Sequence, residues 1–145
     1  MHIRKFQIED TTQVCELLNN ELGKQISVDE LSITVSDMLK SDDYAIFVAE
    51  QNKEFLGFIG VHFGLAFEIT GKVIRIIALA VKECYQHRGI GTKLLEAAEN
   101  CAIEYSAFVI GVNSGLQRII AHSFYEKHKF CKKGYSFTKN IELTE

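Results

Sequence analysis

The stretch "KVIRIIALAVKECYQHRGIGTKLLEAA", residues 72–98, joins an apolar segment, a glycine turn and an amphipathic segment. Residues 72–81 are apolar at most positions, which is typical of a central strand covered on both faces. After Gly91 the apolar residues recur at helical spacing. Gly89 and Gly91 stand between the two segments, and glycine turns that open helices often hold phosphate groups. The stretch therefore predicts a strand, an anion-binding turn and a helix.

Patterns on both sides of this stretch predict an α/β or α+β domain with a mixed sheet. His2 to Gln7 alternates as an edge strand does, and Thr11 or Thr12 is the expected N-cap of a helix that reaches Leu22. No repeat or linker divides the chain, so 1–145 is predicted to be a single domain. The other expected elements are a helix over 28–39, strands over 44–50, 55–67 and 73–81, a helix over 91–105, a strand over 107–112, a helix over 118–128 and a terminal strand over 132–137.

Composition and charge exclude several kinds of partner. The chain has 145 residues, of which 47% are hydrophobic, and carries a net charge of -3. No global basic field is present, so a nucleic acid partner is not expected. The N-terminus lacks the apolar block of a signal peptide, and no apolar run approaches the roughly 20 residues of a membrane span. A soluble cytoplasmic protein with no membrane partner is predicted.

The cysteines give no sign of a metal site. Cys15, Cys84, Cys101 and Cys131 are widely spaced and form no CxxC pair. Zinc sites in small domains draw their ligands from short, closely spaced motifs. The sequence therefore predicts reduced thiols and no bound metal.

Spacing excludes two common phosphate motifs at the glycine turn. A P-loop requires glycine where Gln86 stands and lysine where Thr92 stands. A dinucleotide fingerprint requires a third glycine where Leu94 stands. The remaining pattern is Gln-x-x-Gly-x-Gly over residues 86–91, with Arg88 as an added positive charge. Backbone N–H groups in such a turn suit a pyrophosphate, although a strand-to-helix turn with no ligand has the same glycines.

Two segments of the chain carry a resemblance to a known family. Leu79, Val81, Gln86, Gly89 and Gly91 match the L-x-V and [Q/R]-x-x-G-x-[G/A] pattern. That pattern resembles the acetyl-CoA-binding core of the GNAT (GCN5-related N-acetyltransferase) acyltransferases.

The second segment, "SGLQRIIAHSFYEKHKF" over residues 114–130, is similar to the family's C-terminal block. Ala121, Phe124, Tyr125 and Phe130 occupy its expected positions. The order of elements along nearly the whole chain also agrees with this family.

The resemblance implies an acetyl-CoA-dependent N-acetyltransferase that transfers the acetyl group directly to an amine. It implies a mostly antiparallel mixed sheet flanked by helices, whose parallel β-α-β core splays to hold acetyl-CoA, with no metal. Tyr125 is the expected general acid that protonates the departing thiolate. The residues expected to bind the cosubstrate are Leu79, Ala80, Val81, Gln86, His87, Arg88, Gly89, Ile90, Gly91 and Thr92.

The general base and the acceptor stay open at this point. Members of the family often carry an acidic residue shortly before the L-x-V, where this chain has Ala78. Candidate bases are Glu68, His62, Glu83 and His122, and titration of the amine by solvent is an alternative.

The acceptor is expected to be a primary amine of a small molecule or peptide: a polyamine, an aminoglycoside, an amino acid or a protein N-terminus. The resemblance assigns its pocket to residues 11–40 and nearby loops. A catalytically weak CoA-binding sensor or interaction module with the same fold is the alternative function. Exposed strand edges at the chain's ends allow a homodimer.

Overall fold

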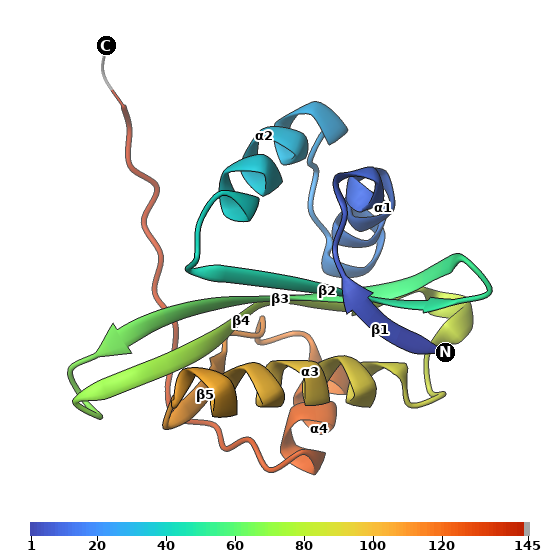
Figure 1. Cartoon of the computed structure of the whole chain (residues 1–145). Helices are drawn as coiled ribbons and strands as arrows, with labels where there is room; N and C mark the ends of the chain where they lie inside the picture. The colour runs from blue at the N-terminus through green and yellow to red at the C-terminus, as the bar shows by residue number, and fades with distance from the viewer. Residues whose placement is uncertain (144–145) are drawn as a thin grey trace. The chain divides into compact units, whose positions relative to one another are not determined.

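The computed structural model describes residues 1–143 and contains one mixed β-sheet (Figure 1). The five strands of these residues lie in the order β1-β2-β3-β4-β5, and all neighbours are antiparallel except β4 and β5, which are parallel. The predicted mixed, mostly antiparallel sheet with a parallel β-α-β unit is therefore confirmed. The strands are β1 (His2–Lys5), β2 (Tyr44–Gln51), β3 (Glu54–Ala66), β4 (Gly71–Val81) and β5 (Val109–Val112).

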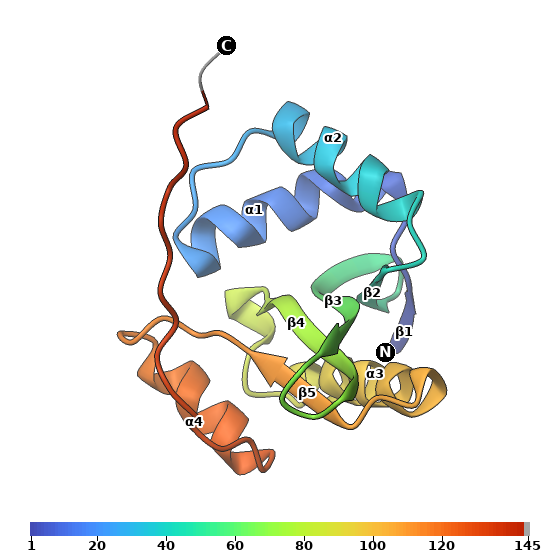
Figure 2. The same ribbon diagram turned by 90° about the vertical axis from the view of Figure 1, so that its left-hand side faces the viewer.

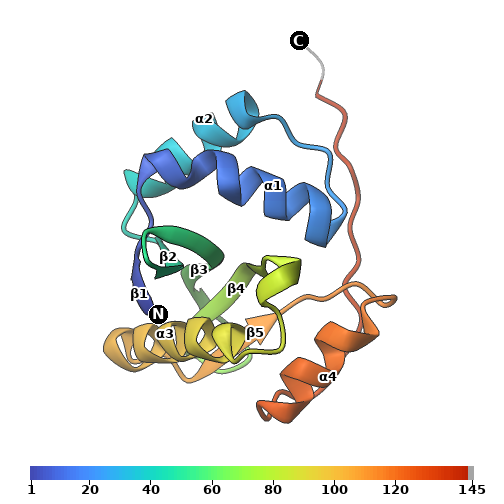
Figure 3. The same ribbon diagram turned by 90° about the vertical axis from the view of Figure 1, so that its right-hand side faces the viewer.

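Helices cover both faces of this sheet. Helices α1 (Thr11–Leu22) and α2 (Val28–Leu39) lie on one face, and α3 (Ile90–Tyr105) lies on the other, as Figures 1 and 3 show. All three agree with the helices predicted from apolar spacing to within a residue or so at their ends.

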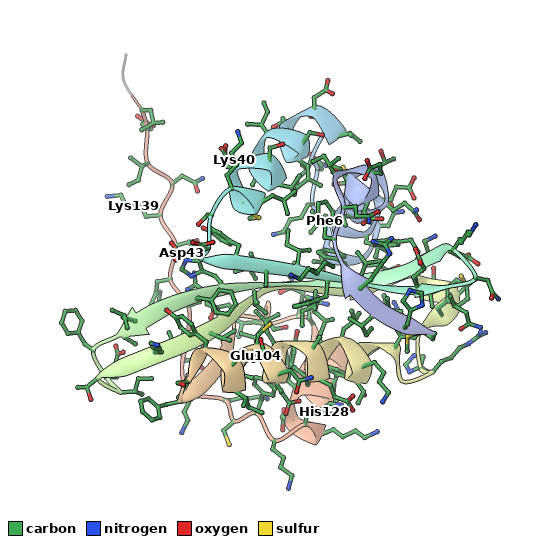
Figure 4. The ribbon with its side chains drawn as sticks, viewed as in Figure 1. Phe6, Lys40, Asp43, Glu104, His128 and Lys139 are labelled. Atoms are coloured by element: carbon green, nitrogen blue, oxygen red, sulfur yellow. The ribbon has the colours of Figure 1, made fainter. Side chains whose placement is uncertain are left out.

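Apolar side chains fill the space between the sheet and each helical layer. Phe6, which follows β1, points into the layer beneath α1 and is 6% exposed (Figure 4). Val48 and Phe58 are buried in the same cluster. Ile59 follows Phe58 and lies on the opposite face, where it and Leu94 of α3 are fully buried. The sheet thus has an apolar layer on each side.

The chain forms two compact units, Met1–Val112 and a second unit that begins at Asn113. The first unit holds the whole sheet with α1, α2 and α3. The second holds α4 (Ile119–Lys127), followed by extended chain (Figure 2). The prediction of a single domain over 1–145 stays a prediction.

The start of α1 differs from its prediction. A short 3-10 turn, η1 (Ile8–Asp10), runs directly into the helix, and Asp10 is the N-cap residue. Thr11 and Thr12 are the first two residues of the helix itself, and the Thr11 hydroxyl donates to the Ile8 carbonyl at 2.6 Å. The expected cap at Thr11 or Thr12 is therefore wrong, because the preceding turn supplies the entry to the helix.

The expected terminal strand over 132–137 is also wrong. Residues 131–143 belong to no helix or strand, and every one of them is exposed. A strand is stabilised by the hydrogen bonds of a neighbouring strand, and the described chain supplies none to this segment. The segment does alternate between apolar and polar residues, but no strand of the described residues pairs with it.

No helix among residues 1–143 combines the length and the apolar character needed to cross a bilayer. Within the same residues no three His, Cys, Asp or Glu side chains gather as a metal site would require. Cys15 and Cys101 are buried thiols, and Cys84 and Cys131 are exposed ones.

A network of charged groups ties β1 to β2 and to the start of α1. Two guanidinium nitrogens of Arg4 each donate to a carboxylate oxygen of Asp10 at 2.8 Å, and Arg4 Nε donates to Glu50 at 2.9 Å. The Gln7 N–H group donates to Asp10 as well. Burial by itself raises the pKa of the Asp10 carboxyl, but these hydrogen bonds outweigh it, and the pKa lies below its ordinary value.

Replacing Asp10 with Asn is expected to lower the free energy of unfolding at pH 7 by about 1.5–3 kcal/mol, because Arg4 loses its bidentate partner. The lowered pKa of the folded state means that the stabilisation is complete above the ordinary aspartate pKa of about 4 and is lost as the pH falls towards the folded value. Urea unfolding of both proteins at neutral and acidic pH measures this.

The difference between wild type and variant should shrink in acid. Glu9→Gln, an exposed change in the same 3-10 turn, is the control and should leave stability almost unchanged. An Asp10→Asn variant as stable as this control at pH 7 would contradict the structural role of the network.

Candidate functional site

Strand β4 continues beyond its parallel neighbour. Its pairing with β5 ends at Ile76, whereas β4 itself runs to Val81. The Lys82 N–H group donates to a backbone carbonyl of β3 at 2.9 Å. Backbone groups alternate in direction along a strand, so Ala80, two residues earlier, also directs its N–H and carbonyl groups to β3. Leu79 and Val81 alternate with these residues, so their N–H groups point to the other side of β4. This is the side on which β5 lies, but β5 ends before it reaches them.

A β-bulge lies where the two strands part. Gly60 of β3 pairs with Ala78, whereas the next residue, Val61, pairs with Ile76, so Ile77 is an extra residue in β4. Bulges bend a strand and increase its twist. A Cβ atom at Gly60 would lie 3.3 Å from the Ile77 side chain, which shows how closely β3 approaches the bulge. The bulge thus lies directly after the last residue of β4 that pairs with β5.

The turn after β4 presents backbone N–H groups at the start of α3. A short 3-10 turn, η2 (Glu83–Tyr85), follows β4, and the chain then adopts positive φ at His87 (63°) and Gly89 (83°). Within the described chain no backbone carbonyl accepts the N–H groups of residues 87–91. Ile90 is buried and holds the first turn of α3 in place, and Gly91 and Thr92 are half-buried in that turn. The turn is a concavity of N–H donors that suits an anion.

Gln86 fixes the position of this turn through its side chain. Gln86 Nε2 donates to the Val81 carbonyl at 3.0 Å and to the Glu21 carboxylate of α1 at 3.1 Å. The first bond satisfies a carbonyl that β5 leaves without a partner, and the second connects the turn to the last residues of α1. The expected contact of Gln86 with the cosubstrate stays a prediction, and the structure shows that its side chain has two protein partners.

Arg88 lies beside the turn, over an aromatic ring. Its guanidinium carbon is 5.5 Å from the centroid of the Tyr85 ring, within the range of a cation–π interaction. The Tyr85 hydroxyl donates to Glu54 at 2.8 Å, and this bond raises the pKa of the phenol. Together these residues line a hollow of about 300 Å³ next to the start of α3. Arg88 thus adds a positive charge at the edge of the N–H groups.

Tyr125 lies in the second unit, on α4. Its side chain is 8% exposed and its ring makes edge contacts with Phe124 and Phe130, with each centroid 5.4 Å away. Burial raises the pKa of its hydroxyl, and the charge of Arg118 opposes that shift only in part. Tyr125 therefore stays protonated at neutral pH, as a proton donor must.

A polar row crosses the sheet on the face that α1 and α2 cover. Tyr44 of β2, His62 of β3 and Arg75 of β4 are direct cross-strand neighbours, so their side chains share one face. The ring centroids of Tyr44 and His62 are 4.9 Å apart. Arg75 is exposed, and no ion pair joins it to another residue of the described chain. The row lies close to the bulge at Ile77.

The four candidate bases occupy different parts of the chain. Glu68 lies in the exposed turn between β3 and β4, at the opposite end of β4 from η2. Glu83 is in η2, where it borders an open depression of about 670 Å³ between α1 and η2. His122 lies in the second unit with Nε2 2.8 Å from the Gly115 carbonyl. Only His62 stands next to the bulge.

Sequence reasoning named His62 as a candidate base, but it missed the bond between Glu21 and Gln86 and the grouping of His62 with Tyr44 and Arg75. Glu21 is sixty-five residues from Gln86 in the chain, and no local pattern marks it as the partner of the glycine turn. Tyr44, His62 and Arg75 are united only by strand register. The one available signal was that each of them is polar or aromatic within an otherwise apolar strand.

Comparison with known proteins gives a consistent result. A family model described as the acetyltransferase (GNAT) family matches residues 11–130. Among curated proteins, the aminoalkylphosphonate N-acetyltransferase of Salmonella typhimurium is 28% identical over 143 residues, which cover 96% of this chain and 90% of that protein. An uncharacterized N-acetyltransferase of Chlorobaculum tepidum is 25% identical over 134 residues, covering 90% of this chain and 81% of that one.

Solved structures share the fold. A transcriptional regulator from Bacillus halodurans has a TM-score of 0.88 at 20% identity, covering 97% of this chain and 99% of that one. The aminoglycoside 6'-N-acetyltransferase AAC(6')-IG of Acinetobacter haemolyticus has a TM-score of 0.81 at 17% identity, covering 98% of this chain and all of that one.

The two hydrogen bonds of Gln86 predict which substitutions at this position destabilise the protein more. Gln86→Ala is expected to lower the free energy of unfolding by about 1–2 kcal/mol and to speed amide exchange over residues 87–91, because the turn loses both anchors. Gln86→Glu should be worse, since a carboxylate cannot donate and would face Glu21 and a carbonyl. Urea unfolding and hydrogen exchange by mass spectrometry measure both effects.

Gln25→Ala, in the exposed loop between α1 and α2, is the matched control and should change neither quantity. Equal behaviour of the Ala and Glu variants would contradict the bonding of Gln86 described above.

Proposed function

The chain belongs to the acetyltransferase (GNAT) family, and from this premise we propose that it transfers an acetyl group from acetyl-CoA directly to a primary amine of a small molecule. Enzymes of this family are acyltransferases that use acetyl-CoA. We also propose that residues 1–145 act as one N-acetyltransferase domain in the cytoplasm. Four free cysteines, two of them exposed, favour a reducing compartment.

The observation that carries the proposal is the row of N–H groups at residues 87–91. The positive φ angles of His87 and Gly89 turn successive N–H groups to one side, and the N-terminus of α3 adds the positive end of its dipole. Arg88 supplies a full positive charge. These residues fit a diphosphate, so they would hold the diphosphate of coenzyme A.

The open side of β4 suits the remainder of the cosubstrate. Leu79 and Val81 direct N–H groups to the side of β4 beyond the end of β5, where an extended amide-containing arm would find donors. Acetyl-CoA supplies an acyl thioester, whose carbonyl oxygen gains negative charge during attack by an amine. A fixed N–H donor near that oxygen is worth most in the transition state. Ala80 has no such role because its own backbone groups face β3.

Tyr125 is the proposed general acid. Its hydroxyl keeps its proton at neutral pH because burial raises its pKa, and a phenol can share that proton with a departing thiolate. His62 is the proposed base among the four candidates, since it lies beside the bulge and next to Tyr44. A neutral imidazole accepts a proton from the attacking amine.

The polar row also favours one class of acceptor. Arg75 presents a charge with no ion-pair partner in the described chain, on the same face as His62. A guanidinium binds phosphonate and carboxylate oxygens in pairs. The relative from Salmonella typhimurium is named an aminoalkylphosphonate N-acetyltransferase. We therefore propose a small amine that carries an anionic group as the acceptor, in preference to a polyamine or an aminoglycoside.

Release of free thiol from acetyl-CoA in the presence of a panel of amines tests the activity and the acceptor class together. Aminoalkylphosphonates and amino acids should be acetylated faster than polyamines, and Arg75→Ala should raise the KM for the anionic acceptors by about tenfold or more, with little change for neutral amines. Lys72→Ala, also on β4, is the control.

Calorimetric titration with coenzyme A separates the outcomes of this assay. Binding of coenzyme A without turnover of any amine would favour the alternative function, a catalytically weak sensor or interaction module. Absence of binding would reject the proposal altogether.

Tyr125→Phe is expected to lower kcat by more than about tenfold while the affinity for acetyl-CoA changes little, because only the hydroxyl that donates the proton is removed. Steady-state kinetics and calorimetry on the same preparation measure the two quantities. Phe124→Leu, which keeps an apolar side chain beside Tyr125, is the control and should keep most of its kcat. An unchanged kcat in Tyr125→Phe would remove Tyr125 from the mechanism.

A further inference from the structure

Strand β5 carries a glycine beside the arginine of the polar row. The row of Tyr44, His62 and Arg75 crosses β2, β3 and β4, and the partner of Arg75 in the parallel pairing of β4 with β5 is Gly111. Residues that pair across neighbouring strands direct their side chains to the same face of a sheet. The row therefore continues onto β5, which lies beside β4 in Figure 2, and its fourth position has no side chain.

The backbone of β5 does not require glycine at this position. Gly111 has no positive φ angle, and the register of β4 and β5 is continuous from Val73 to Ile76, so no bulge accounts for the glycine. Glycine in the interior of a strand weakens it, and it often marks a place where a ligand or another backbone approaches closely. The reason for Gly111 therefore lies outside β5 itself.

Packing within the unit Met1–Val112 does not require glycine there either. Apart from its chain neighbours, no atom of this unit lies within 4 Å of the place where a Cβ atom of Gly111 would stand. The position of Gly57 in β3 is different, because a Cβ atom there would lie 2.6 Å from the Ala80 carbonyl oxygen. Close packing thus explains Gly57, whereas within its own unit Gly111 has space for a side chain.

A second strand glycine with space for a side chain lies on the same face. Gly64 is two residues after His62 on β3, and a Cβ atom there would meet the His62 ring at 3.6 Å, an ordinary van der Waals distance. Gly64 and Gly111 therefore flank the polar row, one beside His62 and the other beside Arg75. Two such glycines around one polar row are expected where a ligand lies over the row.

The charge at this place indicates the chemistry of the ligand. Arg75 is exposed, and no ion pair joins it to another residue of the described chain. On its β3 side stands the half-buried ring of His62, whereas on its β5 side Gly111 leaves space. A phosphonate or carboxylate must lie in the plane of a guanidinium to accept two N–H groups, so the pair requires space beside the arginine.

We propose that Gly111 is a specificity-determining residue for the anionic group of the acceptor, because its missing side chain leaves space over β5 for the Arg75 guanidinium and the anion bound to it. This role of Gly111 rests on the proposed function, since it concerns the acceptor of the same reaction. Neighbouring strands are about 4.8 Å apart, so a branched side chain at position 111 would contact the Arg75 side chain and its ligand. An acceptor without an anionic group does not use this space.

Substitutions of Gly111 separate this role from a structural one. Gly111→Ala and Gly111→Val should be at least as stable as the wild type in urea unfolding, because both side chains fit the backbone and the space, and valine favours strands. Gly111→Val should nevertheless raise the KM for aminoethylphosphonate by more than about tenfold, and Gly111→Ala should raise it less. The KM for ethanolamine, in which a hydroxyl replaces the phosphonate, should rise far less than that.

Val109→Ile is the matched control, since it adds a methylene group to the same face of β5 two residues away, where Val109 is 42% exposed. It should change neither stability nor the KM for aminoethylphosphonate. A Gly111→Ala variant less stable than the wild type would mean that packing requires the glycine, and it would overturn the inference. Equal effects of Gly111→Val on aminoethylphosphonate and on ethanolamine would overturn it too.

A double variant shows whether the effect acts through Arg75. Calorimetric titration of the coenzyme A complex with aminoethylphosphonate measures acceptor binding without turnover. Gly111→Val combined with Arg75→Ala should bind this acceptor no more weakly than Arg75→Ala alone, because both changes remove the same contact. Additive losses in the double variant would overturn the inference.

The wild type distinguishes failure of this inference from failure of the proposed function. If the wild type acetylates aminoethylphosphonate and Gly111→Val does so with the same KM, only the role of Gly111 is rejected. If the wild type binds coenzyme A but neither acetylates nor binds aminoethylphosphonate, the anionic acceptor and the role of Gly111 are rejected together. A wild type that does not bind coenzyme A would reject the proposed function along with them.

Discussion

Beyond Ile76, β4 has a hydrogen-bonded neighbour on one side only, and backbone groups that lack a ladder partner must find another or bind a ligand. The extra residue at Ile77 bends the strand at this point. The Val81 carbonyl is satisfied by the side chain of Gln86, whereas the N–H groups of Leu79 and Val81 stay open. The end of β5 at Val112 thus leaves open N–H groups on one side of β4, where we propose that the amide-containing arm of the cosubstrate binds.

The same feature connects the strand to the phosphate-type turn. The Gln86 side chain donates hydrogen bonds to the carbonyl of Val81 at the end of β4 and to the carboxylate of Glu21 near the end of α1. The turn that follows is therefore anchored on both sides before its N–H groups begin at residue 87. An anion-binding turn loses affinity if it must be ordered on binding, so this anchoring favours a preorganised site. The helix α1, which is on the proposed acceptor side, shares in that anchoring.

The positively and negatively charged side chains of the candidate site lie in different places. Arg88 stands at the edge of the glycine turn, and Arg75 stands on the other side of the bulge with His62. Acidic residues of α1 and η2, among them Glu16, Glu21 and Glu83, border the open depression between these elements. Arg88 belongs to the proposed site of the coenzyme A diphosphate, whereas Arg75 is the charge available to the acceptor, and for this reason we propose an anionic acceptor rather than a polycation.

The sequence by itself determined most of the helices and strands and the place of the glycine turn. Apolar periodicity placed α2, β2, β3, β4 and α3, and the spacing of Gly89 and Gly91 placed the turn, because both depend on neighbouring residues. Tertiary structure decided what depends on residues distant in sequence. The bulge at Ile77, the bond from Gln86 to Glu21 and the polar row arise from strand register and helix packing. Residues 132–137 form no strand for the same reason. Alternation of apolar and polar residues predicts which face of a strand is apolar, but a strand forms only where a neighbouring strand supplies hydrogen bonds.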